Sequence, residues 1–193
     1  MARPREFDTD DVLEKAMQAF WSSGYAATSL ADLTSAMGIS KSSFYETFGS
    51  KHELFLATIE RYGETAAERT AAVLENSTRA KGAIATVFEF VIDAATSDGE
   101  RRGCFINNCA VESASHDADV ASRVVTCITR LESAFESAVS RGQEAGDIAT
   151  DHDAKALARF LTCTMQGLIS TAKANPDREK LHDIVRIAMA VLD

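Results

Sequence analysis

The chain has 193 residues, of which 46% are hydrophobic and 25% charged, so it can bury the core of one large domain or two small ones. Pro4 and Pro176 are its only prolines, and the interval between them is rich in Ala, Leu, Glu and Ser, which favours an all-α fold. The net charge of −9 argues against a protein that coats nucleic acid non-specifically, because such proteins bind through positive charges that neutralise phosphates.

The N-terminus and the cysteines indicate the compartment. The chain opens on charged and polar residues, so we predict no signal peptide, and no run of about 18 apolar residues predicts a membrane span. We therefore expect a cytoplasmic protein. The four cysteines, Cys104, Cys109, Cys127 and Cys163, lack the C-x-x-C spacing of zinc sites, and a cytosol would keep them reduced.

A polar arm and one helix come first along the chain. The arm carries Arg3 and Arg5 and is either an unstructured start or a segment that reaches DNA. The helix is predicted over residues 8–23, with Asp8 as its N-cap and Gly24 after its last turn. Its apolar residues recur at helical spacing, so it should pack against the two helices that follow.

Two short helices joined by a glycine turn are predicted over residues 27–54. Ser29 begins a capping-box pattern, Gly38 supplies the turn, and Ser40 caps the second of the two helices. This pattern is typical of a helix-turn-helix, whose second helix enters the major groove of DNA. Tyr45 on that helix is either a second core aromatic or an exposed phenol that donates to a phosphate.

The run from Gly24 to Phe55 reads G-Y-x-x-T-S-L-x-x-L-x-x-x-x-G-I-S-K-x-S-F-Y-x-x-F-G-S-K-x-x-L-F and closely resembles the TetR family of bacterial transcriptional regulators. The resemblance implies that hydroxyl, phenol and lysine groups of this run contact DNA. The residues at the matching positions are Thr28, Ser29, Ser40, Lys41, Ser42, Ser43, Tyr45 and Lys51. Thr34 departs from the common alanine, and Glu46 places an acid on the recognition helix, where it would repel phosphate but accept from cytosine.

The charge of this region leaves a second class of function open. The first 55 residues hold five Lys or Arg and eight Asp or Glu, so any DNA contacts must come from a few placed groups. An all-α ligand-binding protein that has lost DNA binding is therefore the alternative. The presence of both Tyr45 and Lys51 favours DNA binding, and we expect no enzyme, because no catalytic constellation stands out.

The rest of the chain is predicted to be helical as well. Apolar stripes at helical spacing predict six further helices, at about residues 51–76, 81–97, 103–112, 118–145, 152–174 and 176–192, with a turn at Asp98-Gly99. We therefore predict about nine helices. They divide into a helix-turn-helix DNA-binding domain over residues 1–52 and a ligand-binding and dimerisation domain over residues 53–193.

The TetR resemblance also implies what the larger domain does. In that family it holds a small-molecule pocket, and its last two helices pair with a second subunit as a four-helix bundle. The chain would then be a homodimeric repressor that a small molecule of unknown identity, and no cofactor, releases from a palindromic DNA operator. The side chains that we place in the pocket are Phe88, Phe105, Asn108, Cys109, Leu131, Phe135 and Gln166.

One cysteine supplies an alternative mode of regulation. Cys104 follows Arg101 and Arg102 near a predicted helix N-terminus, which would lower its pKa and make it a thiolate that senses electrophiles or oxidants. The other three cysteines are predicted to be small buried hydrophobic residues. The four histidines have polar neighbours and are predicted to be solvated, so we expect no metal site.

Overall fold

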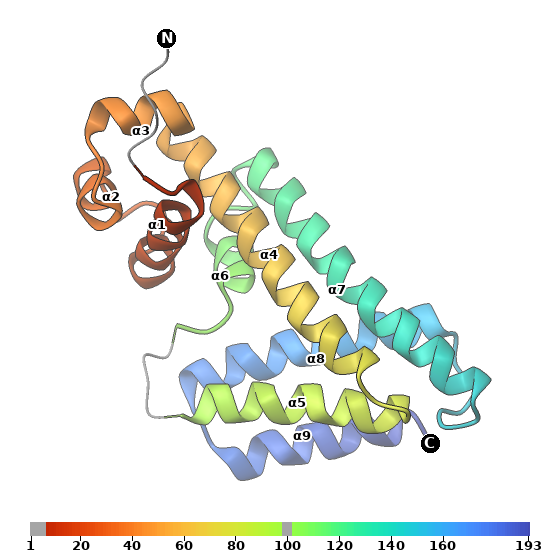
Figure 1. The fold of residues 1–193 in the computed structure, drawn as a ribbon. Helices are drawn as coiled ribbons and strands as arrows, with labels where there is room; N and C mark the ends of the chain where they lie inside the picture. The colour runs from red at the N-terminus through yellow and green to blue at the C-terminus, as the bar shows by residue number, and fades with distance from the viewer. Residues whose placement is uncertain (1–6, 98–101) are drawn as a thin grey trace.

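The computed structural model describes residues 7–97 and 102–193 of the chain. Over these residues it contains nine α-helices and no strand, which confirms the all-α prediction (Figure 1). The helices are α1 (Thr9–Ser23), α2 (Leu30–Met37), α3 (Lys41–Phe48), α4 (Lys51–Glu75), α5 (Ala80–Thr96), α6 (Phe105–Glu112), α7 (Ala118–Glu144), α8 (Ala154–Ala174) and α9 (Arg178–Ala190). The predicted arm with Arg3 and Arg5 and the predicted turn at Asp98-Gly99 lie outside the described residues. None of the described helices is long and apolar enough to cross a lipid bilayer.

The N-terminal unit consists of α1 to α3, and its helices begin at the caps that the sequence predicts. The carboxylate of Asp8 accepts the backbone N–H of Asp10 at the start of α1 (2.9 Å). Ser29 and Asp32 form a reciprocal capping box at α2, and Gly38 adopts a left-handed conformation (φ 69°) that turns the chain towards α3. The three helices share a core, to which they contribute the buried side chains of Phe20, Leu33 and Phe44.

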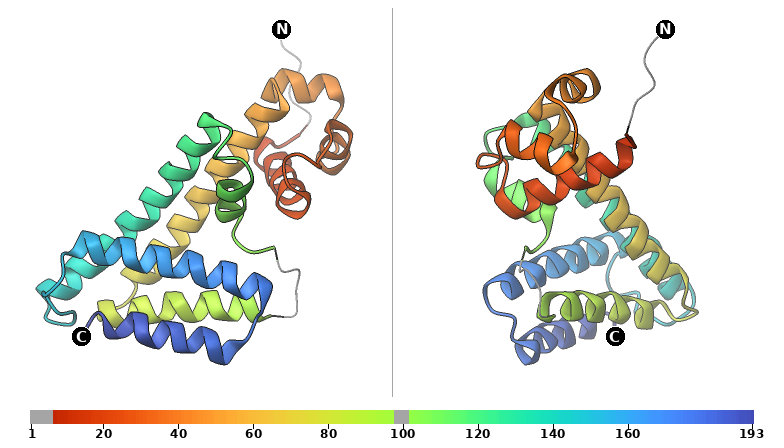
Figure 2. Two further views of the ribbon diagram at one scale, coloured as in Figure 1. Left: turned by 180° about the vertical axis from the view of Figure 1, so that it is seen from behind. Right: turned by 60° about the vertical axis from the view of Figure 1, so that its left-hand side comes forward.

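Helices α4 and α7 lie side by side and run in the same direction along most of the molecule (Figure 1, Figure 2). His52 at the start of α4 bonds Asp117 immediately before α7, and the Arg141 side chain near the end of α7 donates to the carbonyl of Leu74 near the end of α4 (2.9 Å). Between these points a Cβ added to Gly63 would lie only 2.1 Å from a side-chain atom of α7. The two helices therefore pack in direct contact, and α4 links the N-terminal unit to the rest of the protein.

The described residues form two hydrophobic cores, which do not follow the predicted domain boundary. One core joins α1 to α4 with α6 and the first half of α7. The other joins α5, α8 and α9 with the far ends of α4 and α7, where Phe88 and Phe135 stack with their ring centroids 6.4 Å apart. Because α4 continues without a break from Lys51 to Glu75, the boundary between residues 52 and 53 stays a prediction.

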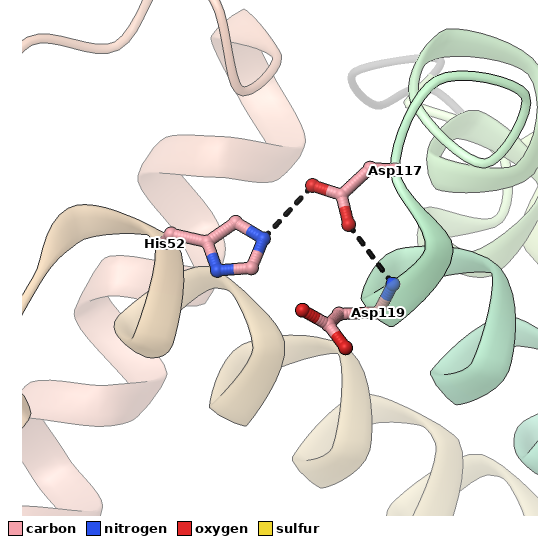
Figure 3. Close-up of side chains that lie close together, drawn as sticks. All are labelled: His52, Asp117 and Asp119. Atoms are coloured by element: carbon pink, nitrogen blue, oxygen red, sulfur yellow. Dashed lines mark hydrogen bonds and ion pairs between the residues drawn. The ribbon is translucent and has the colours of Figure 1, made fainter.

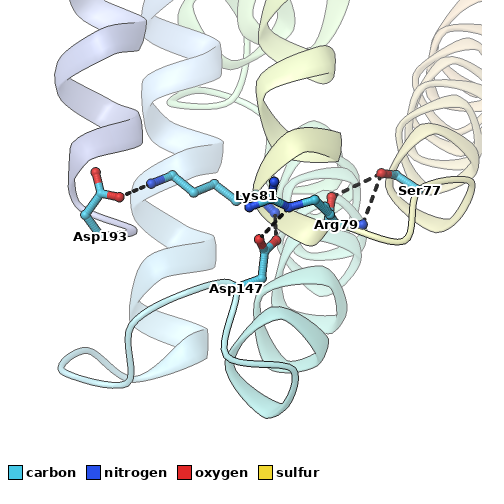
Figure 4. A network of polar contacts seen from close by, with 5 residues as sticks. All are labelled: Ser77, Arg79, Lys81, Asp147 and Asp193. Atoms are coloured by element: carbon cyan, nitrogen blue, oxygen red, sulfur yellow. Dashed lines mark hydrogen bonds and ion pairs between the residues drawn. The ribbon is translucent and has the colours of Figure 1, made fainter.

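A polar network joins the elements around the start of α5 (Figure 4). The carboxylate of Asp147, in the loop after α7, accepts the backbone N–H of Lys81 (2.8 Å) and the Nε–H of Arg79 (3.1 Å), and these hydrogen bonds lower the pKa of Asp147. Lys81 Nζ in turn pairs with the carboxylate of Asp193, and Ser77 Oγ donates to the carbonyl of Arg79 (3.1 Å). The network ties the start of α5 to the α7–α8 loop and to the C-terminal residue.

Candidate nucleic-acid interface and effector cavity

Helix α3 packs its aromatic side against the core and exposes its polar side to solvent. Phe44 is fully buried, whereas Tyr45 is 54% exposed and packs edge-on against Phe44 with 5.4 Å between the ring centroids. Lys41 and Ser42 in the first turn of α3 are also exposed. Of the two alternatives for Tyr45, the structure therefore shows the exposed phenol. Exposed phenol, ammonium and hydroxyl groups are the kinds of group that contact DNA phosphates.

The other predicted DNA-contacting hydroxyls take part in local structure. Thr28 is 2% exposed and donates to a backbone carbonyl that precedes α2 (2.7 Å). Ser29 Oγ donates to the carboxylate of Asp32 (2.6 Å). Ser40 Oγ accepts the backbone N–H of Ser43 (3.1 Å) and lies 3.0 Å from Ser43 Oγ. These groups position α2 and α3, and their contacts with DNA stay predictions.

Lys51 is held at the start of α4, just after the recognition helix. Its Nζ lies 4.4 Å from the centroid of the Tyr25 ring, which is a cation–π distance. Partial burial of the ammonium group lowers the pKa of Lys51. The ring contact restricts a side chain that would otherwise be flexible, so Lys51 is oriented before any DNA arrives.

A histidine–carboxylate pair joins the start of α4 to the residue before α7 (Figure 3). His52 Nε2 lies 2.8 Å from Asp117 Oδ2, and Asp117 Oδ1 accepts the backbone N–H groups of Asp119 (3.0 Å) and Val120 (3.1 Å). The hydrogen bond from Val120, together with that from His52, holds the pKa of Asp117 below its usual value. The prediction that every histidine is solvated is therefore wrong for His52, which is half-buried in this junction.

The same junction is where the described residues come nearest to a metal-binding arrangement. His52, Asp117 and Asp119 each offer a ligand atom, and these atoms lie within 4.8 Å of one another. Both oxygens of Asp117 are already engaged, one by the imidazole and one by the N-terminus of α7. Capping and the link to α4 account for the arrangement without a metal ion.

A cavity of about 850 Å³ lies between the N-terminal unit and the larger domain. Residues of α1 form one of its walls, and residues of α4, α5, α7, α8 and the segment around the start of α6 form the others. The residues that line the cavity include Glu14, Gln18, Trp21, Tyr62, Arg69, Val73, Val87, Phe90, Val91, Arg102, Cys104, Leu131, Gln166, Ile169 and Lys173. Its volume is that of a site for a small organic molecule.

Only Leu131 and Gln166 of the seven predicted pocket residues line this cavity. Phe88, Phe105, Cys109 and Phe135 are buried in the two cores, because each faces a neighbouring helix instead of the cavity. The amide of Asn108 also lies outside the wall, where it donates to the carbonyl of Arg102 (3.0 Å) and accepts from Lys173 Nζ (3.1 Å). Asn108 therefore bridges α6 and α8 and does not face the cavity.

Three aromatic residues of the wall were missed by the sequence analysis. Trp21 and Tyr62 pack edge-to-face with 5.1 Å between their ring centroids, and Phe90 is 58% exposed on the cavity side of α5. The sequence contains a feature that could have identified two of them. Phe90 lies outside the narrow apolar stripe of α5, and Trp21 lies outside that of α1. Large aromatic side chains off the core stripe of a helix need another place to pack.

The structure overturns the predicted chemistry of Cys104. This residue lies at the N-terminus of α6 and on the cavity wall, with the Tyr62 hydroxyl donating to its Sγ (3.8 Å). Burial raises the pKa of the Cys104 thiol, so the prediction of a lowered pKa is wrong. The Arg102 guanidinium donates to Gln18 and lies over the Trp21 ring. Arg101 lies outside the described residues.

The predicted burial of the other cysteines is correct for two of the three. Cys109 and Cys127 are buried, and burial raises the pKa of the Cys127 thiol to about 11. Cys163 is exposed on α8, so its predicted burial is wrong. The three residues all lie on apolar helices, and only the packing of those helices decides which side faces solvent.

Alkylation should show the protonated state of Cys104. At about pH 7.5 we expect iodoacetamide to label Cys104 in the folded chain severalfold more slowly than in the chain unfolded in guanidinium, because the thiolate is the reactive form and burial disfavours it. Peptide mass spectrometry measures both rates. Labelling of the folded chain at the unfolded rate or faster would instead support a reactive thiolate.

Helices α8 and α9 carry apolar side chains that nothing in the described chain covers. Phe160 on α8 is 41% exposed, and Ile184 and Ile187 on α9 are 40% and 63% exposed. A Cβ added to Gly167 on α8 would meet no atom within 4 Å. Exposed apolar helix faces of this kind are typical of subunit interfaces.

The described helices thus form a three-helix unit with an exposed recognition helix, joined through α4 to a helical domain with a ligand-sized cavity. This arrangement defines a DNA-binding regulator with a site for an effector. Residues 12–58 match the model of the bacterial regulatory proteins, tetR family, and residues 80–188 match that of the tetracyclin repressor-like C-terminal domain. The chain belongs to the TetR family and is a DNA-binding transcriptional regulator.

Known relatives resemble the chain over its whole length. It is 35% identical to the uncharacterized HTH-type transcriptional regulator YezE of Bacillus subtilis (strain 168), with 100% of both chains covered. It is 35% identical to the HTH-type transcriptional repressor ComR of Escherichia coli (strain K12), over 94% of this chain and 87% of that one. A solved structure of a cysteine mutant of the TetR family regulator CifR, complexed with 26-bp operator DNA, superposes with a TM-score of 0.85 and 32% identity, covering 99% of this chain and 100% of that one.

Proposed function

We propose that the protein is a homodimeric repressor that acts in the cytoplasm and leaves a palindromic operator when a small molecule fills the cavity. The observation that carries this proposal is the composition of the cavity wall, because Trp21 and Gln18 belong to α1 of the DNA-reading unit. A molecule in the cavity therefore touches the reading unit directly. The relatives named as repressors and the operator complex of CifR support the assignment.

The physical basis is a difference in binding between two conformations. A dimer presents two recognition helices, which both fit DNA only when their separation matches that of the half-sites. An effector weakens operator binding only if it binds better to the conformation that does not match. Since α1 and the larger domain share the cavity, a molecule placed between them changes the angle at which α1 to α3 sit on α4.

Two alternatives are less well supported by the geometry. Regulation through a Cys104 thiolate is disfavoured, since burial raises the pKa of that thiol. A protein that has lost DNA binding would not need to keep Lys41 and Tyr45 exposed on a recognition helix whose caps are intact.

Operator binding provides the first test. The operator can be selected from random duplexes, and the affinity can then be measured at several salt concentrations. We expect Lys41→Ala to weaken binding by at least about tenfold and to reduce the salt slope by about two, because the dimer loses one phosphate contact in each half-site. The matched control is Lys155→Ala, an exposed lysine on α8, which should leave both quantities unchanged. An unchanged salt slope in the Lys41 variant would contradict a phosphate contact.

The sign of regulation is tested separately. A promoter that carries the selected operator should become less active when the chain is expressed in the same cell, and the Lys41→Ala variant should relieve this effect in part. Higher promoter activity with the wild-type chain would identify an activator and overturn the repressor assignment.

A further inference from the structure

Among the described residues of the cavity wall, the charged groups are mostly positive, although the chain as a whole carries a net charge of −9. The basic ones are Arg69, Arg102 and Lys173, and the acidic one is Glu14. Glu14 is exposed at the rim, and its carboxylate already accepts from the amide of Gln18 (2.8 Å). Arg69 and Lys173 are exposed as well, so the described part of the wall that faces solvent carries more positive than negative side chains.

Two of these cations have no carboxylate partner among the described residues. Lys173 Nζ donates to the neutral amide oxygen of Asn108 at 3.1 Å. Arg69 forms no ion pair with a described residue, and its positive charge acts on the Tyr62 phenol. Exposed cations without a described counter-ion at the mouth of a largely apolar cavity favour an occupant whose anionic group lies at that mouth.

The indole of Trp21 adds a donor without an acceptor. Its Nε1 is shielded from solvent and has no hydrogen-bond partner, although the ring is held by Tyr62 at 5.1 Å and by Phe105 at 6.3 Å between centroids. An N–H group that is buried without an acceptor is costly in a folded protein. Trp21 lines the cavity, but its Nε1 has almost no accessible surface, so a bound molecule reaches this donor only if the indole ring turns.

The rest of the wall is apolar. Its side chains come from α4, α5, α7 and α8 and include Val73, Val87, Phe90, Val91, Leu131 and Ile169. The cavity thus has a cationic, solvent-facing part and a larger apolar part.

We propose that the effector is an amphiphilic organic anion, a carboxylate attached to an apolar chain or ring. The carboxylate pairs with Arg69 where that side chain is exposed at the cavity, while the apolar portion lies against the side chains of α5, α7 and α8. A cationic molecule would meet the like charges of Arg69 and Lys173, and a neutral apolar one would leave both without a counter-ion among the described residues. This inference rests on the proposed role of the cavity as the effector site.

The chain contains its own reporter for this test. Trp21 is the only tryptophan, so its fluorescence reports on a ligand in the cavity. The probes are hexanoate, octanoate, dodecanoate and 4-phenylbutanoate, each compared with the alcohol and the amine of the same carbon skeleton. Calorimetry measures affinity, Trp21 emission reports the site, and anisotropy of labelled operator reports release.

We expect at least one carboxylate to bind about tenfold or more tightly than its alcohol and its amine, because an ion-paired carboxylate gains charge-assisted hydrogen bonds. It should also change the Trp21 emission. Arg69→Gln should reduce carboxylate affinity about tenfold and leave alcohol affinity unchanged, whereas Arg61→Gln, an exposed arginine on α4 outside the wall, should change neither. Thermal melts of each variant confirm that it is folded.

The outcomes separate the two proposals. If a carboxylate binds but does not release the operator, the anion inference stands and the regulatory function fails. If an alcohol or amine binds more tightly than its carboxylate and releases the operator, the regulatory function stands and the anion inference is wrong. The anion inference is also wrong if none of the carboxylates binds at concentrations on the order of millimolar, or if the Arg69 and Arg61 variants behave alike.

Discussion

The Ile187→Asp variant should be a monomer that binds the operator at least about 100-fold more weakly than the wild-type chain. Ile187 is 63% exposed on α9, beside the exposed apolar side chains that α8 and α9 present. In a dimer formed through these helices, the new carboxylate would be buried without a partner, which strongly opposes association. Each monomer would then bind a single half-site, without the increase in affinity that a dimer obtains by binding two linked half-sites.

Sedimentation equilibrium and operator titration measure the two effects. The control is Val111→Asp, which introduces the same charge at an aliphatic residue that is 84% exposed on α6, outside α8 and α9. It should remain a dimer with full affinity. If the Ile187 variant is still a dimer at micromolar concentration, the subunits do not associate through this face.

The Gly63→Ala variant should be less stable than the wild-type chain by about 1–3 kcal/mol. At this point on α4, an added Cβ would lie 2.1 Å from Cys127 Sγ and 2.8 Å from Cys127 Cβ on α7. The sulfur can move by rotation, but the Cβ of Cys127 moves only with α7 itself. The two helices must therefore separate, and the core that they share with α1 and α6 loses contacts.

Chemical unfolding measures this loss of stability. Gly82→Ala is the control, because a Cβ at this exposed position of α5 would have its nearest contact at 3.8 Å, with Arg79 Cβ. There the higher helix propensity of alanine should leave the free energy of unfolding unchanged or raise it by up to about 1 kcal/mol. Equal effects of the two substitutions would mean that α4 and α7 do not pack as closely as described.

The local structure of the reading unit was predictable because it depends on neighbours in the sequence. The caps at Asp8, Ser29 and Ser40 and the left-handed turn at Gly38 all appear as expected. Each of these features involves side chains and backbone groups a few residues apart, whose geometry the local conformation largely determines. The apolar stripes predicted the helices for the same reason.

The cavity was not predictable in this way. Phe88 and Phe135 are as apolar as Phe90, yet the first two are buried in a core and the third lines the cavity. Cys104 has the sequence neighbours of a reactive thiol but the surroundings of a buried one. Such differences arise from how helices that are distant in the sequence are rotated and spaced against one another. The apolar stripe of a single helix carries no information about that arrangement.

The sequence by itself determined the helix-turn-helix from Gly24 to Phe55, the caps that position it and the all-α class, since these follow from short-range hydrogen bonds and helical periodicity. Tertiary structure alone decided that α1 forms a wall of the cavity, that His52 bonds Asp117 and that the N–H of Trp21 is buried without a partner. These features arise where α1, α4 and α7 meet. Their geometry depends on close packing between segments that are distant in the sequence, such as His52 and Asp117, which are 65 residues apart.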